Sequence, residues 1–475
     1  MDTNYDLIVV GTGFASSFFL KNYLEIQGTS TRVLVLERGK FHPHSKRLSE
    51  KRGEVNLAIN KAGKTYRTNS DKIWVFDPNF GGSSNCWTGC TPRFLPNDLK
   101  LRSTYGVGRD WPISYDDLSP YYDRVEQIMQ IAGPELTPFP KSSKYPLPPH
   151  KLSTVDQILQ KKYGSQYISQ PTARASLAVG DRNACCTSAV CDVCPVNSKF
   201  TIENGIGDIY KDVRVTLKYN CQVLGLKTGS NTAQSIEYLE EGISKSAKAD
   251  TYVLGANGVF NAHILLNSGD DNPLTGAGIT EQVGVFARLY YKDLDNVGGS
   301  SIITANGYMM YDGAHRKDHA GCLIESFNTP FIRNEAGKWR KMSIFKFVYE
   351  DLPDNGNKVK LTEDERIPEI VYNGHSTYTQ RAIDKLPEQI KEYFSILPIE
   401  RMEVDNYRQK TEFHICSSTR MGDTIDNSVV DKNLVHHKYK NILVLGSSVY
   451  PTVTPANPTL TLSALSLMAC NNYFQ

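Results

Sequence analysis

The N-terminal segment constrains the fold more than any other part of the sequence. Residues 5–10, Tyr-Asp-Leu-Ile-Val-Val, form a short apolar run that leads into Gly-Thr-Gly and then into a helix-compatible stretch. A second apolar run, residues 31–39, carries Glu37 at its end and completes a strand–helix–strand unit of about thirty residues. This order predicts a Rossmann-like α/β domain that binds a dinucleotide.

The glycine turn of this unit suits a pyrophosphate. Gly11 permits the turn, and Gly13 lets a pyrophosphate approach the backbone at the positive end of the helix. Ser16 stands where a third glycine usually packs, and a small residue there still allows close helix–strand contact. Glu37 is placed to accept a hydrogen bond from a ribose hydroxyl and to repel a 2′-phosphate. The motif alone leaves FAD, NAD and a tight turn without a ligand as alternatives.

Length and charge narrow the class of partner. A chain of 475 residues predicts two closely associated domains, formed from alternating segments. The 53 Lys and Arg nearly balance the 51 Asp and Glu, and basic residues form no long runs, which argues against nucleic acid and favours a small molecule. We see no transmembrane segment, and the start lacks the features of a signal peptide, so we expect a cytoplasmic protein.

The middle of the chain predicts loops first and strands later. Residues 41–110 are rich in Gly, Asn, Ser and Pro and predict long, cofactor-covering loops. A helix is expected from Tyr115 onward within 111–132, and a Pro-rich linker over 134–150. Successive strands are expected over 213–229, 235–242 and 249–258. A sheet over 286–350 is expected to form a wall of a substrate cavity.

Four cysteines crowd into a short segment that is followed by Pro195. They are Cys185, Cys186, Cys191 and Cys194. Several thiolates within ten residues suit an iron–sulfur cluster, and a proline after the last cysteine recurs in such loops. A structural zinc site, disulfides and unbound thiols are the alternatives.

Two blocks near the C-terminus carry a family resemblance. The first, 414–422, reads His-Ile-Cys-Ser-Ser-Thr-Arg-Met-Gly, and the second, 441–469, contains a strand, Gly446 and a helix that begins after Asn457. Together they resemble the glucose-methanol-choline (GMC) oxidoreductases, although Ser418 stands where this family usually has glycine. The resemblance implies an FAD-binding domain built from discontinuous segments (1–130, 200–285 and 420–475), a linker and cysteine segment (131–199), and an α+β substrate domain with an antiparallel sheet (286–419).

The resemblance also implies the catalytic roles. His414 would remove the alcohol proton while hydride passes from the carbinol carbon to flavin N5, and Asn457 would orient the hydroxyl. The chemistry of the two side chains agrees with these roles independently of the family. A neutral imidazole is a suitable base, and an amide can hold the substrate oxygen without competing for its proton. The alternatives are a structural histidine at 414 and a helix N-cap at 457.

Residues 80–94 would lie over the flavin in this family. Gly81 and Gly82 would let the backbone approach the isoalloxazine ring, with Ser83, Asn85 and Cys86 beside them, and Gly446 and Ser447 would form the far wall. Cys86 aligns with the histidine through which pyranose 2-oxidases attach FAD. A cysteinyl flavin is therefore one interpretation of Cys86, and a buried thiol is the simpler one.

Residues 95–126 are similar to bacterial FAD-dependent glucose, gluconate and fructose dehydrogenases, of which the glucose enzymes carry a related cysteine block. This similarity implies Cys185, Cys186 and Cys191 as ligands of a 3Fe-4S cluster, or with Cys194 a 4Fe-4S cluster, that relays flavin electrons to a cytochrome or small subunit. It predicts a dehydrogenase that oxidises an alcohol or hemiacetal hydroxyl of a sugar-like substrate. An oxygen-using sugar or aminoglycoside oxidase with structural cysteines, a non-catalytic flavin-binding subunit, and export together with a partner are the alternatives.

Overall fold

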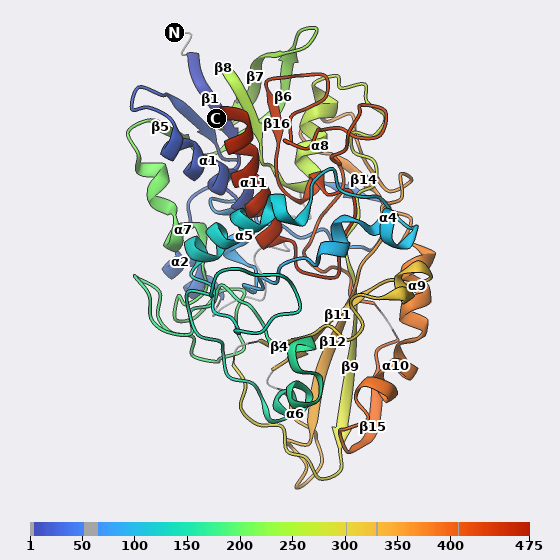
Figure 1. The fold of residues 1–475 in the computed structure, drawn as a ribbon. Coiled ribbons are helices and arrows are strands. Elements are labelled where there is room, and N and C mark those ends of the chain that lie inside the picture. Colours follow the sequence, from blue (N-terminus) through green and yellow to red (C-terminus); the bar gives the residue numbers. More distant parts are fainter. Residues whose placement is uncertain (1–3, 52–64, 301, 329–330, 407) are drawn as a thin grey trace.

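The computed structural model describes residues 4–51, 65–300, 302–328, 331–406 and 408–475. Two β-sheets lie toward opposite ends of an elongated molecule, and both chain termini lie at the end that holds the first sheet (Figure 1). Of the loop segment expected over 41–110, residues 52–64 lie outside the described residues.

The first sheet has seven strands in the order β5-β2-β1-β8-β7-β6, with β16 also paired to β8. The pairs among β5, β2, β1, β8 and β16 are parallel, and β7 runs antiparallel to both of its neighbours. The strand bounds are β1 Asn4–Val10, β2 Val33–Leu36, β5 Val215–Lys218, β6 Cys221–Thr228, β7 Ala233–Glu240, β8 Ile243–Leu254 and β16 Ile442–Val444. Central parallel strands are covered on both faces, which explains why β1 and β2 are continuous apolar runs.

Helices α1 (Phe14–Ile26) and α11 (Thr459–Phe474) pack against each other beside this sheet. Asn22 of α1 donates from its amide nitrogen to the carbonyl of Leu467 at 3.1 Å. Both helices are buried along most of their length, so neither sequence shows an amphipathic stripe. Helix α5 (Tyr115–Met129) is capped by Ser114, whose hydroxyl accepts from the backbone N–H of Asp117. Helix α8 spans Asn257–Asn267.

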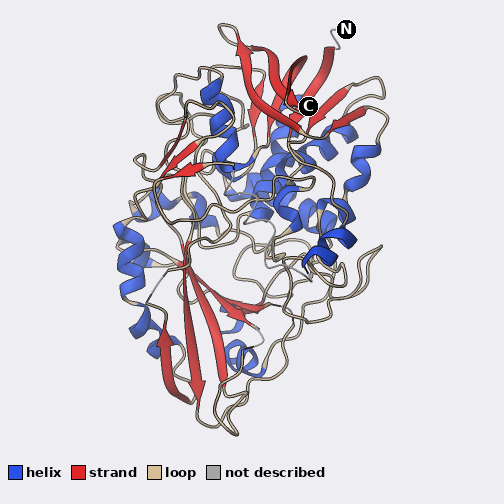
Figure 2. Ribbon diagram, turned by 180° about the vertical axis from the view of Figure 1, so that it is seen from behind, coloured by secondary structure: helices blue, strands red, loops and turns tan. Residues whose placement is uncertain are grey.

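The second sheet has six strands, all antiparallel, in the order β15-β9-β12-β11-β10-β4, and it forms the long strands of the lower half in Figure 2. The strands are β4 Tyr167–Ser169, β9 Val283–Tyr291, β10 Ile303–Gly307, β11 Cys322–Phe327, β12 Met342–Tyr349 and β15 Ile399–Val404. One face packs on α6 (Thr154–Tyr163), α9 (Thr377–Asp384) and α10 (Leu386–Tyr393). The predicted fold, a Rossmann-like sheet joined to an antiparallel substrate sheet, is confirmed.

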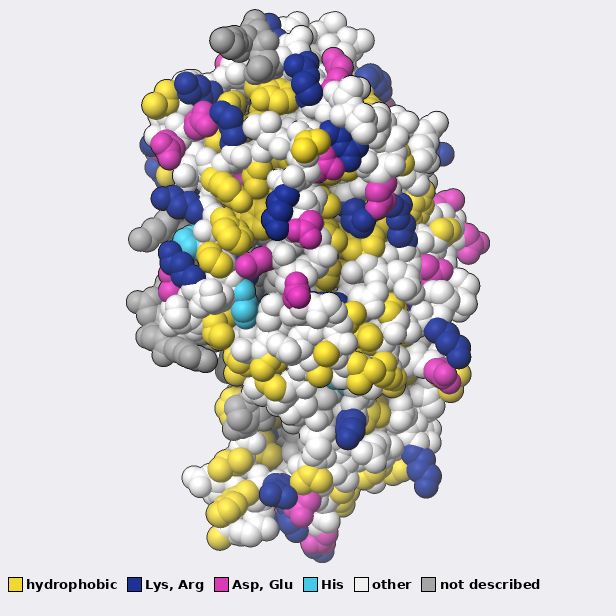
Figure 3. All heavy atoms as spheres, turned by 90° about the vertical axis from the view of Figure 1, so that its left-hand side faces the viewer, with side chains coloured by type: hydrophobic (Ala, Val, Ile, Leu, Met, Phe, Trp, Pro, Cys, Tyr) yellow, Lys and Arg dark blue, Asp and Glu magenta, His cyan; other side chains and the backbone are white. Residues whose placement is uncertain are grey.

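The shorter elements complete the surface. They are α2 His44–Lys51, α4 Leu101–Tyr105, α7 Ile202–Gly205, and a three-stranded sheet of β3 Arg67–Thr68, β13 Lys358–Lys360 and β14 Glu369–Val371. Among the described residues, no helix combines the length and the apolar character that crossing a bilayer requires. On the face shown in Figure 3, acidic and basic side chains are interspersed and neither sign forms a continuous patch.

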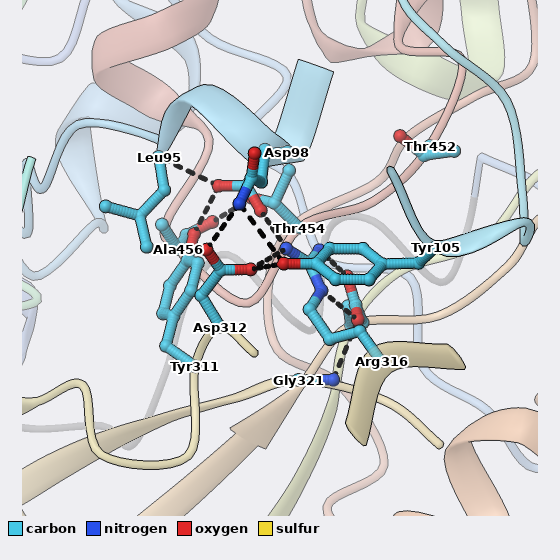
Figure 4. A network of polar contacts seen from close by, with 12 residues as sticks. Leu95, Asp98, Tyr105, Tyr311, Asp312, Arg316, Gly321, Thr452, Thr454 and Ala456 are labelled. Atoms are coloured by element: carbon cyan, nitrogen blue, oxygen red, sulfur yellow. Dashed lines mark hydrogen bonds and ion pairs between the residues drawn. The ribbon is translucent and has the colours of Figure 1, made fainter. Parts of the chain in front are cut away.

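A buried charge network joins the loop after β10 to the segment before α5. Arg316 forms ion pairs with Asp98 (3.0 Å), Asp312 (3.2 Å) and Glu350 (Figure 4). The next residue after Glu350, Asp351, forms an antiparallel bridge with Val453. Figure 4 accordingly shows Thr454 and Ala456 close to the network. These charges therefore support the loop 451–457 that leads into α11.

Candidate active site

One cavity of about 540 Å³ is lined by residues of both sheets. At one end its wall holds Gly11, Gly13 and Glu37, and at the other end it holds His414 and Asn457. The chain thus brings its N-terminal glycine turn and its C-terminal blocks to a single space, although Glu37 and His414 are 377 residues apart in sequence.

At the glycine turn, backbone geometry excludes side chains. Gly11 has φ +83°, and a Cβ there would lie 2.8 Å from the carbonyl oxygen of Gly255. The Ser16 hydroxyl donates to the carbonyl of Val10 at 3.0 Å, and a Cβ on Gly255 would lie 1.9 Å from that hydroxyl. Gly255, which the sequence analysis did not identify, therefore provides the close packing that a third motif glycine usually provides. No side chain caps the start of α1, so its first N–H groups face the cavity end without a side-chain acceptor.

Glu37 is buried and connects the strand end to the glycine turn. Its carboxylate accepts from the Thr12 N–H at 3.0 Å, the Thr12 hydroxyl at 2.6 Å and the Gly39 N–H at 2.9 Å. Burial raises the pKa of Glu37, and these hydrogen bonds lower it in part. Glu37 also lines the cavity, and its contact with a ribose stays a prediction.

The loop predicted to cover the flavin lies against the glycine turn. The Gly81 N–H donates to the Thr12 hydroxyl at 2.9 Å, and a Cβ on Gly82 would lie 3.1 Å from the Cα of Gly13. Of the residues predicted to bind the cofactor, the cavity wall includes Gly82, Ser83, Cys86, Gly446 and Ser447 as well as Gly11, Gly13 and Glu37; Ser16, Gly81 and Asn85 do not line it.

Asn85 and Cys86 have distinct roles in this loop. The Asn85 amide donates to the Asp77 carboxylate at 3.0 Å and to the Phe80 carbonyl at 2.9 Å, so it shapes the loop. Burial raises the pKa of the Cys86 thiol to about 12. A protonated thiol is a poor nucleophile, so this environment does not favour a cysteinyl flavin.

The four clustered cysteines do not converge on one point. Cys186 is exposed and Cys185 half-buried, whereas Cys191 and Cys194 are buried. Within the described ranges, no group of three or more His, Cys, Asp or Glu side chains is arranged to hold a metal ion. The arrangement therefore does not fit an iron–sulfur cluster or a zinc site, and the expected cluster finds no support.

The cysteine segment nevertheless lies beside the cavity. Lys199, which the sequence analysis did not single out, donates from its ammonium group to the carbonyls of Trp87 (2.7 Å) and Asp192 (2.8 Å). This buried lysine holds the segment 191–194 against the flavin loop. Burial lowers the pKa of Lys199 to about 8.

His414 stands at the other end of the cavity and is partly exposed toward it. Thr280 and Cys416 exchange backbone hydrogen bonds at 3.2 and 2.9 Å, which aligns residues 280–282 antiparallel to residues 414–416. This alignment places Gln282 opposite His414. The side-chain oxygen of Gln282 is hydrogen-bonded to His414 Nδ1. Burial, and then the positive charge of Lys346, lower the pKa of His414 to about 3, so the imidazole is neutral.

Asn457 is buried and also lines the cavity. Its amide nitrogen donates to the Glu325 carboxylate at 3.3 Å, while its side-chain oxygen has no hydrogen-bond partner among the described residues. Pro458 is the residue at the N-cap of α11, and no side chain caps that helix. The interpretation of Asn457 as a helix cap is therefore wrong, and its unpaired oxygen suits a bound ligand.

The cavity wall near His414 also carries charges that the sequence analysis did not identify. Glu325 and Lys346 face each other across β11 and β12, and Lys346 forms an ion pair with Glu412. Strand alternation places Lys346 on the cavity side of β12, while Phe345 and Phe347 enter the core behind the sheet. Burial raises the pKa of Glu412 to about 7, although Lys346 lowers it in part. In the sequence, a lysine within a strand is typical of a residue that faces solvent. The sequence therefore carries no sign that Lys346 is part of the cavity wall.

The comparisons with known proteins agree with this geometry. Residues 354–466 match the family model for GMC oxidoreductases. The chain is 28% identical to the fructose dehydrogenase large subunit of Gluconobacter japonicus, over 82% of this chain and 79% of that protein. It is 23% identical to 6'''-hydroxyparomomycin C oxidase of Streptomyces lividus, over 98% of this chain and 90% of that protein. The fold is similar to that of pyridoxine 4-oxidase from Mesorbium loti, with a TM-score of 0.70, 17% identity and 99% coverage of both chains.

Fold and site together define an oxidoreductase with a dinucleotide-binding sheet, an antiparallel substrate sheet and a cavity between them. Residues 354–466 match the GMC oxidoreductase family, and the chain as a whole is similar in sequence and fold to flavoprotein dehydrogenases and oxidases. It is a flavoenzyme, dehydrogenase or oxidase, that acts on CH–OH donors, and the family implies FAD as its cofactor.

The residues present fit FAD. The glycine turn and Glu37 line the same cavity as the buried amide oxygen of Asn457, which has no hydrogen-bond partner among the described residues, and a glycine turn followed by a buried acidic residue suits a dinucleotide. Bound FAD would supply a hydride acceptor near His414.

Proposed function

We propose that this protein oxidises an alcohol or hemiacetal hydroxyl of a sugar-like substrate and delivers the electrons to an external acceptor other than oxygen. The observation that carries the proposal is the continuity of one cavity from Gly11 and Glu37 to His414 and Asn457. In this reaction His414 accepts the hydroxyl proton at its unprotonated ring nitrogen, and Asn457 positions the substrate oxygen. The carbinol carbon loses its hydrogen as hydride, for which bound FAD would supply the acceptor.

The cavity wall supports a polyhydroxylated substrate. Glu325, Lys346 and Glu412 offer hydrogen-bond donors and acceptors, and the rings of Phe286 and Phe327 lie within 5.3 and 6.0 Å of the Lys346 ammonium. A wall that combines fixed polar groups with aromatic faces matches the two kinds of surface on a sugar ring. Two relatives carry names that refer to a sugar and to an aminoglycoside.

The electron acceptor separates two candidate functions. The name of one relative describes the large subunit of a dehydrogenase, which supports electron transfer through a partner subunit or cytochrome, whereas the name of another describes an oxidase. The cysteine segment does not fit a cluster, so no step of the proposal passes through one. We propose a cytoplasmic location, with export alongside a partner subunit as the alternative.

A substrate panel tests the proposal. The purified flavoprotein is mixed anaerobically with sugars, sugar acids, aminoglycosides and simple alcohols, and the loss of oxidised-flavin absorbance is recorded. We expect bleaching by a sugar-like alcohol, and no bleaching by any member would contradict the proposal. Peroxide formation in air at a rate equal to that with an artificial acceptor would identify an oxidase. Iron and acid-labile sulfide assays on anaerobically purified protein are expected to find neither above background.

A further inference from the structure

The side chain of Gln282 lies between His414 and the loop that carries Asn457. Its amide nitrogen donates to the carbonyl oxygens of Thr454 at 2.7 Å and of Ala456 at 2.8 Å. Its amide oxygen is hydrogen-bonded to His414 Nδ1. Gln282 is 3% exposed, so no water competes for these groups.

The two carbonyls determine which way the Gln282 amide points. Both N–H groups of the amide are used by Thr454 and Ala456, and a flipped amide would place its oxygen against two carbonyl oxygens. The amide oxygen must therefore face His414. An oxygen can only accept here, so Nδ1 carries the proton, and in a neutral imidazole Nε2 is then the acceptor.

We infer that Gln282 is a positioning residue that sets the tautomer of His414, with the proton on Nδ1 and the lone pair of Nε2 directed to the substrate hydroxyl. This inference rests on the proposed function, because it concerns the base of that reaction. In the opposite tautomer Nε2 would carry a hydrogen, and the substrate proton would have no acceptor. During the reaction the hydroxyl proton moves to Nε2, and the Nδ1–H bond to Gln282 is kept throughout.

The Gln282 amide also links His414, the proposed base, to the loop of Asn457, the residue proposed to position the substrate. Ala456, an acceptor for Gln282, directly precedes Asn457. The Gln282 amide therefore fixes the base and the start of the Asn457 loop relative to each other. The Gln282 side chain thus bonds the His414 ring on one side and the backbone carbonyls of Thr454 and Ala456 on the other.

The tautomer can be measured without turnover. In protein labelled with ¹⁵N-histidine, the two ring nitrogens of a neutral imidazole give distinct signals, and the His414 signals are those absent from His414→Ala. We expect the Nδ1–H form in the unchanged protein and a shift to Nε2–H in Gln282→Met, which keeps the side-chain length but removes the acceptor. Gln409→Met makes the same chemical change elsewhere in the cavity wall and should leave the His414 signals in place.

Flavin reduction gives a second readout. Gln282→Met should slow anaerobic flavin reduction about 10²-fold, the lower range for general-base catalysis, and should do so in the rate at saturating substrate more than in the apparent Kd. Gln282→Glu keeps an oxygen facing His414, and although its second oxygen then faces the Thr454 and Ala456 carbonyls, its negative charge should move the limb that reports protonation of His414, below that of Glu412, to higher pH. This shift also tests the inference if Gln282→Met fails to fold.

The failure of this inference differs from the failure of the proposed function. An Nε2–H signal for His414 in the unchanged protein would overturn the inference. The same holds if Gln282→Met keeps both the tautomer and the reduction rate, or if Gln282→Glu leaves the acid limb in place. Normal bleaching in His414→Ala would instead remove the base from the proposed function, whatever tautomer is found.

Discussion

The two ends of the cavity differ in how the chain builds them. At the proposed nucleotide end, Gly11, Gly13 and Glu37 come from one strand–helix–strand unit, and the backbone of Gly255 and of residues 81–82 packs closely against the turn. At the catalytic end, His414, Gln282, Glu325 and Lys346 come from separate segments and meet only in the folded protein. The nucleotide end therefore depends on backbone shape, whereas the catalytic end depends on long-range polar contacts.

The largest expected effect is on the buried charges that support the catalytic end. Arg316→Met leaves the carboxylates of Asp98, Asp312 and Glu350 without their shared cation, so we expect a loss of about 3–5 kcal/mol in the free energy of unfolding. Denaturant unfolding measures this loss. Arg67→Met removes an exposed ion pair with Glu363 and should cause no measurable change. Equal stability of the two variants would contradict the assigned role of the network.

The next effect concerns the nucleotide end. Gly11→Ala combines a positive φ with a Cβ 2.8 Å from a backbone oxygen, so we expect FAD to bind at least about tenfold more weakly, or about 1.4 kcal/mol. Equilibrium dialysis of FAD measures this. Gly106→Ala has a similar φ of +79° but open space around the Cβ, and it should keep the FAD affinity. If both variants bind FAD normally, the glycine turn does not limit FAD binding.

A smaller effect follows from the charge on Glu412. Its pKa of about 7 means that acidification protonates it and leaves Lys346 less compensated, which disfavours a positive charge forming on His414. Flavin reduction should therefore fall about threefold to tenfold as the pH drops through 7. Stopped-flow measurement of Glu412→Gln should show the low rate without an inflection near pH 7. Glu403 lies on the exposed side of β15, so Glu403→Gln should retain the inflection. Loss of the inflection in Glu403→Gln would show that a group other than Glu412 causes it.

The smallest expected effect is at Cys86. Because burial keeps this thiol protonated, acid denaturation of the unchanged protein should release all flavin into the supernatant. Cys86→Ser should change flavin reduction by less than about threefold, since it replaces one small neutral group by another. Flavin that stays with the precipitate, and is released only in Cys86→Ser, would demonstrate a covalent bond.

The sequence predicted the two-sheet fold because its signals are local. The buried strand, the glycine turn and the helix of residues 4–26 follow one another, and the helix from Tyr115 starts at a recognisable cap. The C-terminal blocks indicated His414 and Asn457 as candidates, and the structure brings both to the cavity.

The rest of the site could not be predicted because it depends on tertiary contacts. Gln282 lies 132 residues before His414 and carries no motif, and Gly255 compensates for Ser16 from a different strand end. The cysteine spacing predicted a cluster, yet spacing does not specify whether side chains point to a common centre. Local sequence patterns therefore identified some residues of the cavity wall. The other wall residues depend on tertiary packing and could not be predicted.

The central claim is that His414 is the base of an FAD-dependent alcohol oxidation in this cavity. The most direct test is anaerobic flavin bleaching by a substrate in His414→Ala, at an FAD content equal to that of the unchanged protein. We predict that the variant binds FAD and that its bleaching rate falls about 10²- to 10⁴-fold. Bleaching at the rate of the unchanged protein would contradict the claim.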